Sequence, residues 1–220
     1  MQRYLIKNCV VVNEGKSLPL EVLIENGRIA RIGSSIQCKG QVKEINAQGH
    51  YLLPGIIDDQ VHFREPGLTH KATLATEAKA AVAGGVTSYM EMPNTIPPVF
   101  SQELLEDKYT LAQQCSLANY SFYMGTSNTN AEAALATNAK KNSVCGIKIF
   151  MGSSTGGLLV DNYHTLEKIF SESEVLIATH CEDETIIRAN YQERKKNRPD
   201  LGPEDHPLIR NTEACYSSSL

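Results

Sequence analysis

Strand-like and helix-like segments alternate along the chain after Pro54-Gly55. Short runs rich in β-branched and aromatic residues are each followed by a longer segment with helical spacing. This alternation predicts a parallel sheet whose strands are connected by right-handed crossover helices. We expect the strands near residues 56–62, 86–92, 119–124, 145–150 and 175–180.

Five such β/α units, each of about 30 residues, occupy residues 52–220. A closed barrel of eight units usually needs about 250 residues, and fewer remain here. Two architectures fit this count: an open five-stranded α/β sheet, or the front portion of a longer barrel. We favour the second, an α/β fold in which residues 52–220 form the first five units of a partial (β/α)8 TIM-type barrel.

Residues 1–51 have a different pattern and predict a small β-sandwich-like domain. The segment "YLIKNCVVVN" is apolar and β-branched. Asn26-Gly27 separates two further apolar runs, and Asn-Gly between such runs is a strong hairpin signal.

The composition excludes several classes of protein. Of the 220 residues, 41% are hydrophobic, which indicates a folded chain. The net charge is −4 and no long basic run occurs, so nucleic acid and anionic membranes are poor candidate partners. The N-terminal segment has no apolar stretch of the length of a signal peptide or a membrane span. The six cysteines form no C-x-x-C pair, which argues against a zinc knuckle or a disulfide framework and favours a reducing cytoplasm.

Polar side chains gather where the predicted strands end. In parallel sheets the carboxyl ends of the strands meet at one edge, where chemistry is usually located. That edge would bring together a set of residues suited to a metal or an anion: His62, Arg64, Asn94, Lys148 and His180.

Other roles for these residue types are also open. Asp58 and Asp59 suit a turn, and Arg64 could be an ordinary ion-pair partner. Histidines are more often hydrogen-bonded than metal-bound, and this is the interpretation for the four outside the strand ends: His50, His70, His164 and His206.

Lys148 is the most informative of these residues because it interrupts the apolar run "VCGIKIFMG". A buried unpaired ammonium is costly, so it must find a carboxylate, lose its charge or be chemically modified. The following loop at 152–157, "GSSTGG", lacks the ending of a P-loop and is better interpreted as a mobile loop over the site.

Four motifs, in this order and spacing, resemble the amidohydrolase superfamily and, more narrowly, class I-like dihydroorotases: "DDQVHFREPG", "MEMPNT", "GIKIFMGSSTG" and "IATHCED". The resemblance extends over the whole chain but covers only the N-terminal half of such enzymes. It implies that a further metal-binding histidine and the catalytic aspartate lie beyond Leu220, so that no general acid or base is present in this chain.

The resemblance also implies roles for individual residues. His62 and His180 would be metal ligands, and Lys148 would carry a carbamate that bridges two zinc ions. A desolvated neutral lysine can take up CO₂, and two cations would hold the resulting anion. Arg64 and Asn94 would bind the carboxylate of the substrate.

Gln60 departs from the pattern, because the resembled motif usually has histidine at this position. An amide oxygen is a weaker ligand for zinc than imidazole. Three explanations remain open: Gln60 binds metal through its carbonyl oxygen, the site holds one zinc ion instead of two, or the protein is a non-catalytic homologue.

The implied activity is the reversible closure of N-carbamoyl-L-aspartate to dihydroorotate in pyrimidine biosynthesis. The alternatives are another cyclic amidase, of the dihydropyrimidinase, allantoinase or hydantoinase type, and a non-catalytic scaffold. The expected partner is a small-molecule substrate, with the oligomeric state open and a homodimer as one candidate.

Overall fold

The computed structural model describes residues 2–152 and 156–220. The chain divides into two compact units, Met1–Gly55 and Ile56–Leu220. The loop expected at 152–157 includes residues 153–155, which lie outside the described residues, so its role stays a prediction.

The N-terminal unit is a single five-stranded sheet around a small core of Leu5, Leu23 and Ile36. Asn26 and Gly27 form the two-residue turn of its second hairpin, with φ of 51° and 75°. Such turns need positive φ, which confirms the hairpin predicted from Asn-Gly. The sheet order is β3-β2-β1-β4, with β5 also paired to β1, and the strands are β1 (Arg3–Asn13), β2 (Lys16–Glu25), β3 (Arg28–Gly33), β4 (Lys43–Asn46) and β5 (Tyr51–Leu52).

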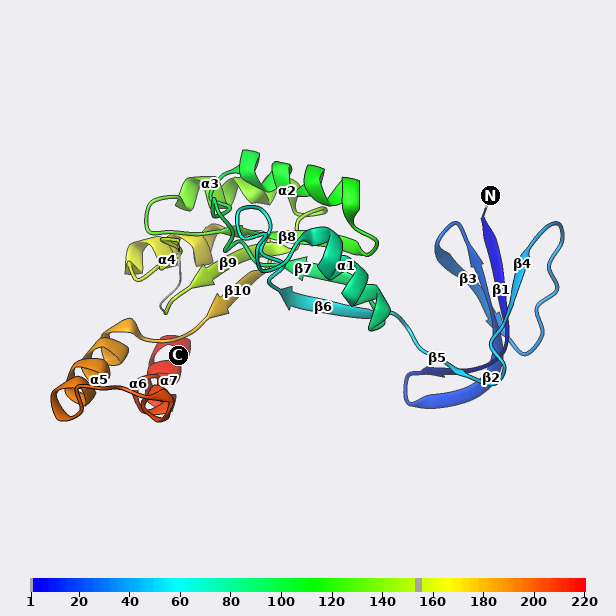
Figure 1. Ribbon diagram of the computed structural model, residues 1–220. Helices are drawn as coiled ribbons and strands as arrows, with labels where there is room; N and C mark the ends of the chain where they lie inside the picture. The colour runs from blue at the N-terminus through cyan, green and yellow to red at the C-terminus, as the bar shows by residue number, and fades with distance from the viewer. Residues whose placement is uncertain (1, 153–155) are drawn as a thin grey trace. The chain divides into compact units, whose positions relative to one another are not determined.

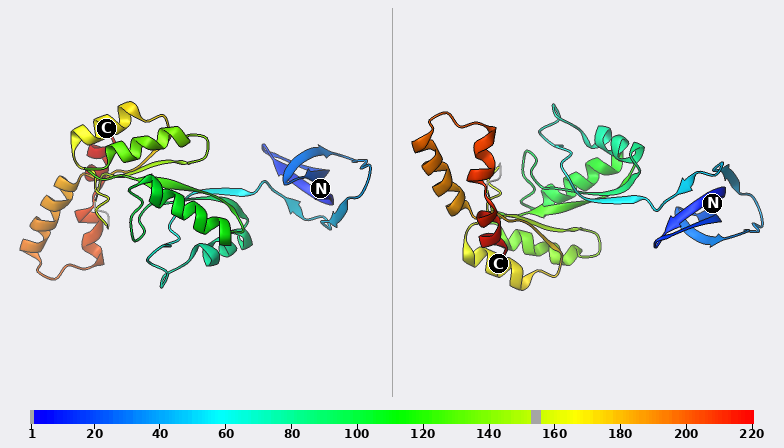
Figure 2. Two further views of the ribbon diagram at one scale, coloured as in Figure 1. Left: turned by 90° about the horizontal axis from the view of Figure 1, so that it is seen from above. Right: turned by 90° about the horizontal axis from the view of Figure 1, so that it is seen from below.

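The second unit contains five strands that pair in the order of the sequence, from β6 to β10, and all pairs are parallel. The colours of Figure 1 and Figure 2 follow this order across the sheet. The predicted parallel arrangement is therefore confirmed, and the strands are β6 (Ile56–Val61), β7 (Val86–Glu91), β8 (Asn119–Gly125), β9 (Gly146–Phe150) and β10 (Ile177–His180).

Helices connect these strands, and α1 to α4 lie along one side of the sheet (Figure 1). Ser101 caps α2 by accepting a hydrogen bond from the backbone of Leu104. The helical elements are α1 (Leu74–Ala83), α2 (Gln102–Cys115), α3 (Ala131–Leu135), η1 (Ala136–Lys140), α4 (Tyr163–Glu172), α5 (Glu184–Asn197), η2 (Pro203–Asp205), α6 (His206–Ile209) and α7 (Thr212–Ser219).

The connection between β8 and β9 is irregular. The single α-helical turn α3 continues as the 3₁₀ helix η1. Asn138 bonds instead to the backbone of Glu172 and Glu174. Short polar side chains of this kind compete with regular helical hydrogen bonding.

The main core lies between the sheet and its helices, and alternate strand residues face it. Ile147 and Ile149 of β9 belong to this core, together with Leu105 and Ala112 of α2. Because side chains alternate between the faces of a strand, Lys148 points to the opposite face. That second face is the inner surface of a partial barrel.

Two loops at the carboxyl ends of β6 and β7 pack closely. The backbone N–H of Ile96 donates to the carbonyl of Pro66 at 3.1 Å. Gly67 adopts a φ of 85°, and a Cβ there would lie 2.1 Å from the carbonyl oxygen of Ile96. The contact leaves no space for a side chain.

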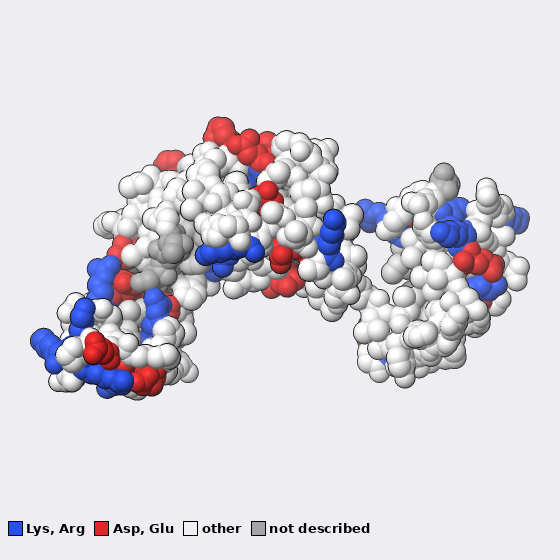
Figure 3. Space-filling view, in the orientation of Figure 1, with Lys and Arg blue, Asp and Glu red and all other residues white. Residues whose placement is uncertain are grey.

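Among the helices of the described ranges, none combines the length and apolar character that a membrane span requires. Positive and negative side chains are interspersed on the face drawn in Figure 3.

We predict that Gly67→Ala destabilises the chain far more than Gly85→Ala. Both glycines have positive φ, which costs about 1–2 kcal/mol for a residue with a Cβ, but a Cβ at Gly85 would have no atom within 4 Å. The clash with Ile96 should bring the total loss for Gly67→Ala to about 4 kcal/mol or more. Urea unfolding followed by circular dichroism measures both, and equal losses would show that the loops are not in close contact.

Candidate metal and substrate site

The inner face of the sheet carries the predicted metal-binding residues. Lys148 of β9 pairs in register with Ala178 of β10, and Phe150 pairs with His180. Alternation along each strand then places Lys148 and His180 on the same face. Phe150 lies between their side chains, with its ring centroid 4.8 Å from the Lys148 nitrogen and 6.1 Å from the His180 ring centroid.

His62 and Asn94 meet at the ends of β6 and β7. The imidazole Nδ1 of His62 lies 2.7 Å from Oδ1 of Asn94. An amide oxygen only accepts hydrogen bonds, so Nδ1 carries the proton. The unprotonated Nε2 is therefore left with a lone pair that could bind a metal.

The surroundings of His62 connect it to the other predicted residues. Burial lowers the pKa of His62, and the positive charges of Arg64 and Lys148 lower it further, while the hydrogen bond to Asn94 acts in the opposite direction. The structure thus brings these four residues into one electrostatic neighbourhood. A low pKa keeps the imidazole neutral, which is the form that binds metals.

Lys148 is only 3% exposed. Within the described ranges its ammonium makes no hydrogen bond or ion pair, and its nearest aromatic contact is Phe150. Burial lowers the pKa of Lys148, with a small opposing effect from Cys181. This shift favours the neutral amine, which is the form that reacts with CO₂.

His180 is held by an acidic neighbour. Its Nε2 lies 2.6 Å from Oε2 of Glu182, which also accepts from Arg210. Burial alone would raise the pKa of Glu182, but the bonds from His180 and Arg210 outweigh burial and lower it. A carboxylate on Nε2–H leaves Nδ1 with its lone pair, as in many metal-binding histidines.

Zinc fits this set of side chains. Among the described residues, each histidine has one ring nitrogen bonded to a protein oxygen and one without a partner, and Lys148 is a buried amine without a hydrogen bond or ion pair. Within residues 2–152 and 156–220, no three His, Cys, Asp or Glu side chains form a metal-binding group. Two of the candidate ligands, Lys148 and Gln60, do not belong to these four residue types.

Gln60 is exposed, and its backbone N–H donates to the carboxylate of Asp58 at 3.2 Å. Asp58 lies within β6, where the pairing with β7 is irregular, so the turn considered for it does not form there. His62 follows the last residue of β6, and the pairing of β6 with β7 is irregular between Asp58 and Val61, so strand alternation does not place Gln60 and His62 on one face. None of these contacts tests the three explanations for Gln60, and metal binding by Gln60 stays a prediction.

Sequence reasoning missed three residues of this region: Lys108, Glu182 as a partner of His180, and Arg210. Lys108 had a detectable signal, because it is three residues after Leu105 and four before Ala112, which places it on the buried stripe of α2. Arg210 had none, since its contact depends on how the C-terminal helices pack.

Comparisons with known proteins decide the family. A family profile described as "Dihydro-orotase-like" matches residues 49–192. A dihydroorotase of Methanosarcina acetivorans is 35% identical over 98% of this chain. The chain belongs to the dihydro-orotase-like family.

Other members of the wider group are also similar. An allantoinase of Solibacter usitatus is 32% identical, covering 100% of this chain and 49% of its own length. The L-hydantoinase of Arthrobacter aurescens superimposes with a TM-score of 0.89 at 23% identity over 99% of this chain and 49% of its own. The dihydroorotase above is matched over 45% of its length, so the chain spans about half the length of these relatives. The likeness of the structures confirms a partial barrel.

We predict that Asn94→Ala lowers the pKa of His62 in the metal-free chain. The hydrogen bond to Asn94 is the contribution that raises this pKa, and its loss leaves burial and the nearby cations unopposed. A pH titration of His62 by NMR measures the midpoint. Asn138→Ala, which removes an amide bonded to Glu172 instead, is the control and should leave the His62 midpoint unchanged. A higher midpoint in Asn94→Ala would contradict the assigned hydrogen bond.

Proposed function

We propose that this chain supplies the metal-binding and carboxylate-binding part of a zinc-dependent cyclic amidohydrolase of the dihydroorotase type. The reaction is the interconversion of N-carbamoyl-L-aspartate and dihydroorotate in pyrimidine biosynthesis. The observation that carries the proposal is the contact between His62 and Asn94 beside Arg64. It joins a metal ligand to two groups suited to a carboxylate.

Three residues are proposed as metal ligands. His62 would bind through Nε2, His180 through Nδ1, and Lys148 as a carbamate. Gln60 would add a weaker amide oxygen, so that one ion is held less tightly than the other. Zinc in such a site polarises a carbonyl and lowers the pKa of bound water to about 7.

The remaining residues orient the substrate. Arg64 presents a guanidinium that can bind a carboxylate through two parallel hydrogen bonds. The amide NH₂ of Asn94 is free to donate, because its oxygen already accepts from His62. When the carboxylate is held, the ring amide has a fixed orientation relative to the metal, which lowers the entropic cost of reaching the transition state.

Proton transfer requires a group from elsewhere. The relatives are about twice as long as the part that matches. We propose that the general acid–base aspartate and a further histidine belong to the part of the enzyme that follows Leu220. This chain by itself should then bind zinc and substrate without appreciable turnover.

A related cyclic amidase is the second candidate, since an allantoinase is among the relatives. The substrates of such enzymes need not carry a carboxylate next to the ring. Arg64 beside His62 favours the dihydroorotase reaction. We further propose that the enzyme works in the cytoplasm and that its partner is a second copy in a homodimer, neither of which bears on the chemistry of the site.

The test compares two rings that differ by one carboxylate. We predict that the zinc-loaded chain binds dihydroorotate more tightly than dihydrouracil, and that Arg64→Met removes this preference. A charge-assisted hydrogen bond contributes about 1.5–3 kcal/mol, so the loss should be about 10- to 100-fold in the dissociation constant for dihydroorotate. Isothermal titration calorimetry measures both ligands.

Arg188→Met is the matched control, because Arg188 is an exposed arginine that pairs with Glu184 on α5. It should leave both affinities unchanged. Equal binding of the two rings, or full retention of the preference in Arg64→Met, would contradict the proposed substrate.

A further inference from the structure

A second buried lysine lies on the opposite side of the sheet from Lys148. Lys108 of α2 is 1% exposed and forms an ion pair with Glu91, at the end of β7, which is 0% exposed. Burial raises the pKa of Glu91 and lowers that of Lys108, and each charge opposes the shift of the other. The proposed chemistry uses neither residue.

Glu91 holds the loop that carries His62 and Arg64. Its Oε1 accepts from the backbone N–H of Phe63, next to Arg64, at 3.1 Å. Arg64 has a φ of 71°. A bulky residue keeps such a conformation only where its surroundings hold it, and the bond from Phe63 to Glu91 anchors the adjacent residue.

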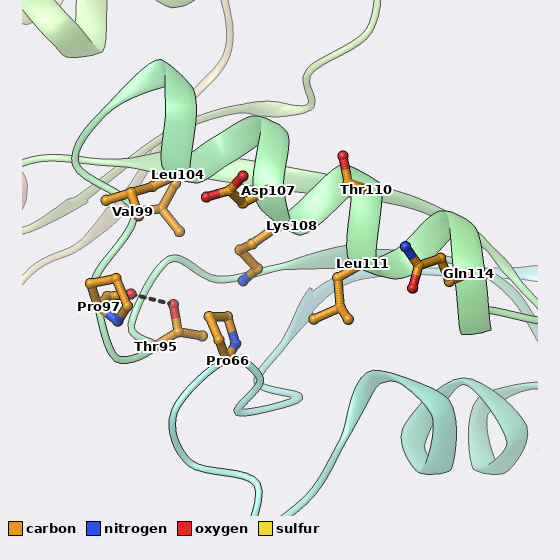
Figure 4. Close-up of a pocket in the computed structure, with 10 residues that line it drawn as sticks. All are labelled: Pro66, Thr95, Pro97, Val99, Leu104, Asp107, Lys108, Thr110, Leu111 and Gln114. Carbon is orange, nitrogen blue, oxygen red and sulfur yellow. Dashed lines mark hydrogen bonds between the residues drawn. The ribbon is translucent and has the colours of Figure 1, made fainter.

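Lys108 holds the neighbouring loop. Its ammonium donates to the carbonyl of Met92 at 3.3 Å, two residues before Asn94. Figure 4 shows Lys108 extending from α2 toward the loops that carry Pro66 and Thr95. These loops and α2 line a pocket of about 490 Å³.

The ion pair therefore contacts both loops that meet in the His62–Asn94 hydrogen bond. A buried ion pair is weak evidence for stability, because two apolar residues of similar volume often serve as well. Apolar residues could not replace its hydrogen bonds to two backbone groups, the N–H of Phe63 and the carbonyl of Met92. The contacts thus point to a role in geometry.

We propose that Glu91 and Lys108 are positioning residues that fix the two strand-end loops so that the His62 imidazole meets the Asn94 amide. The reaction that His62 and Asn94 serve rests on the proposed function. Their alignment by Glu91 and Lys108 does not depend on that reaction. The pair acts from the helix side of the sheet and holds the ring of His62 in the orientation that presents Nε2.

The tautomer of His62 reports this alignment directly. Nitrogen NMR of the metal-free, substrate-free chain, at a pH where His62 is neutral, distinguishes Nδ1–H from Nε2–H. The unchanged chain should show Nδ1–H alone. Glu91→Leu/Lys108→Met, which removes both charges and the acceptor, should fold and give a mixture of tautomers.

The conservative pair Glu91→Gln/Lys108→Met keeps an oxygen that accepts from Phe63. It should shift the mixture toward Nδ1–H without restoring that form completely, because the donor to Met92 is still missing. A role in filling space would not require this shift. If the two double variants give the same tautomer ratio, the proposal is overturned.

Glu91→Asp decides the question if the leucine variant does not fold. It keeps both charges but withdraws the carboxylate by one methylene from the N–H of Phe63, so a mixture is expected, and a single Nδ1–H form would overturn the proposal. Glu106→Gln is the control, since Glu106 lies on the same helix as Lys108 but forms an exposed ion pair with Lys140 of η1. This NMR measurement uses no metal and no substrate. If the chain failed to bind dihydroorotate, the proposed function would be contradicted, but the tautomer of His62 would still test the positioning role of Glu91 and Lys108.

Discussion

The rest of the structure depends on one constraint: strands β6 to β10 pair in parallel and in the order of the sequence. Parallel pairing places all five carboxyl ends at one edge, and alternation along each strand separates two kinds of side chain. Apolar residues such as Ile147 and Ile149 enter the core beneath the helices, while Lys148 and His180 face the inner surface. The candidate site depends on this arrangement, because helices separate its strands along the sequence and only the sheet brings their carboxyl ends together.

The two buried lysines lie on opposite sides of the sheet, and their different surroundings determine their different charge states. Lys108 approaches from a helix and finds a carboxylate, Glu91, so its charge is compensated. Lys148 extends from β9 and finds no such partner within the described ranges, so burial favours its neutral form. The first arrangement suits a fixed structural contact. The second suits a reactive amine.

Much of this could be predicted from the sequence, for identifiable reasons. The strands were predictable because β-branched runs such as that before Asp58 end in polar residues, and Ser101 was predictable as a helix cap. The break in the helix near Asn138 was not, because it depends on contacts with a distant turn. The Glu91–Lys108 pair was also missed, since its partners come from a strand and a helix whose packing no local pattern specifies. The ring orientation of His62 likewise became visible only through its contact with Asn94.

The central claim is that Lys148 is a reactive amine that becomes a metal ligand. Carbon NMR of the chain with zinc and ¹³C-enriched bicarbonate tests it most directly, because a lysine carbamate gives its own carbonyl signal. We predict one such signal that needs zinc, disappears in Lys148→Met and persists in Lys141→Met, a lysine that pairs at the surface with Glu174. The absence of a signal in the zinc-loaded chain, or one that survives Lys148→Met, would contradict the account.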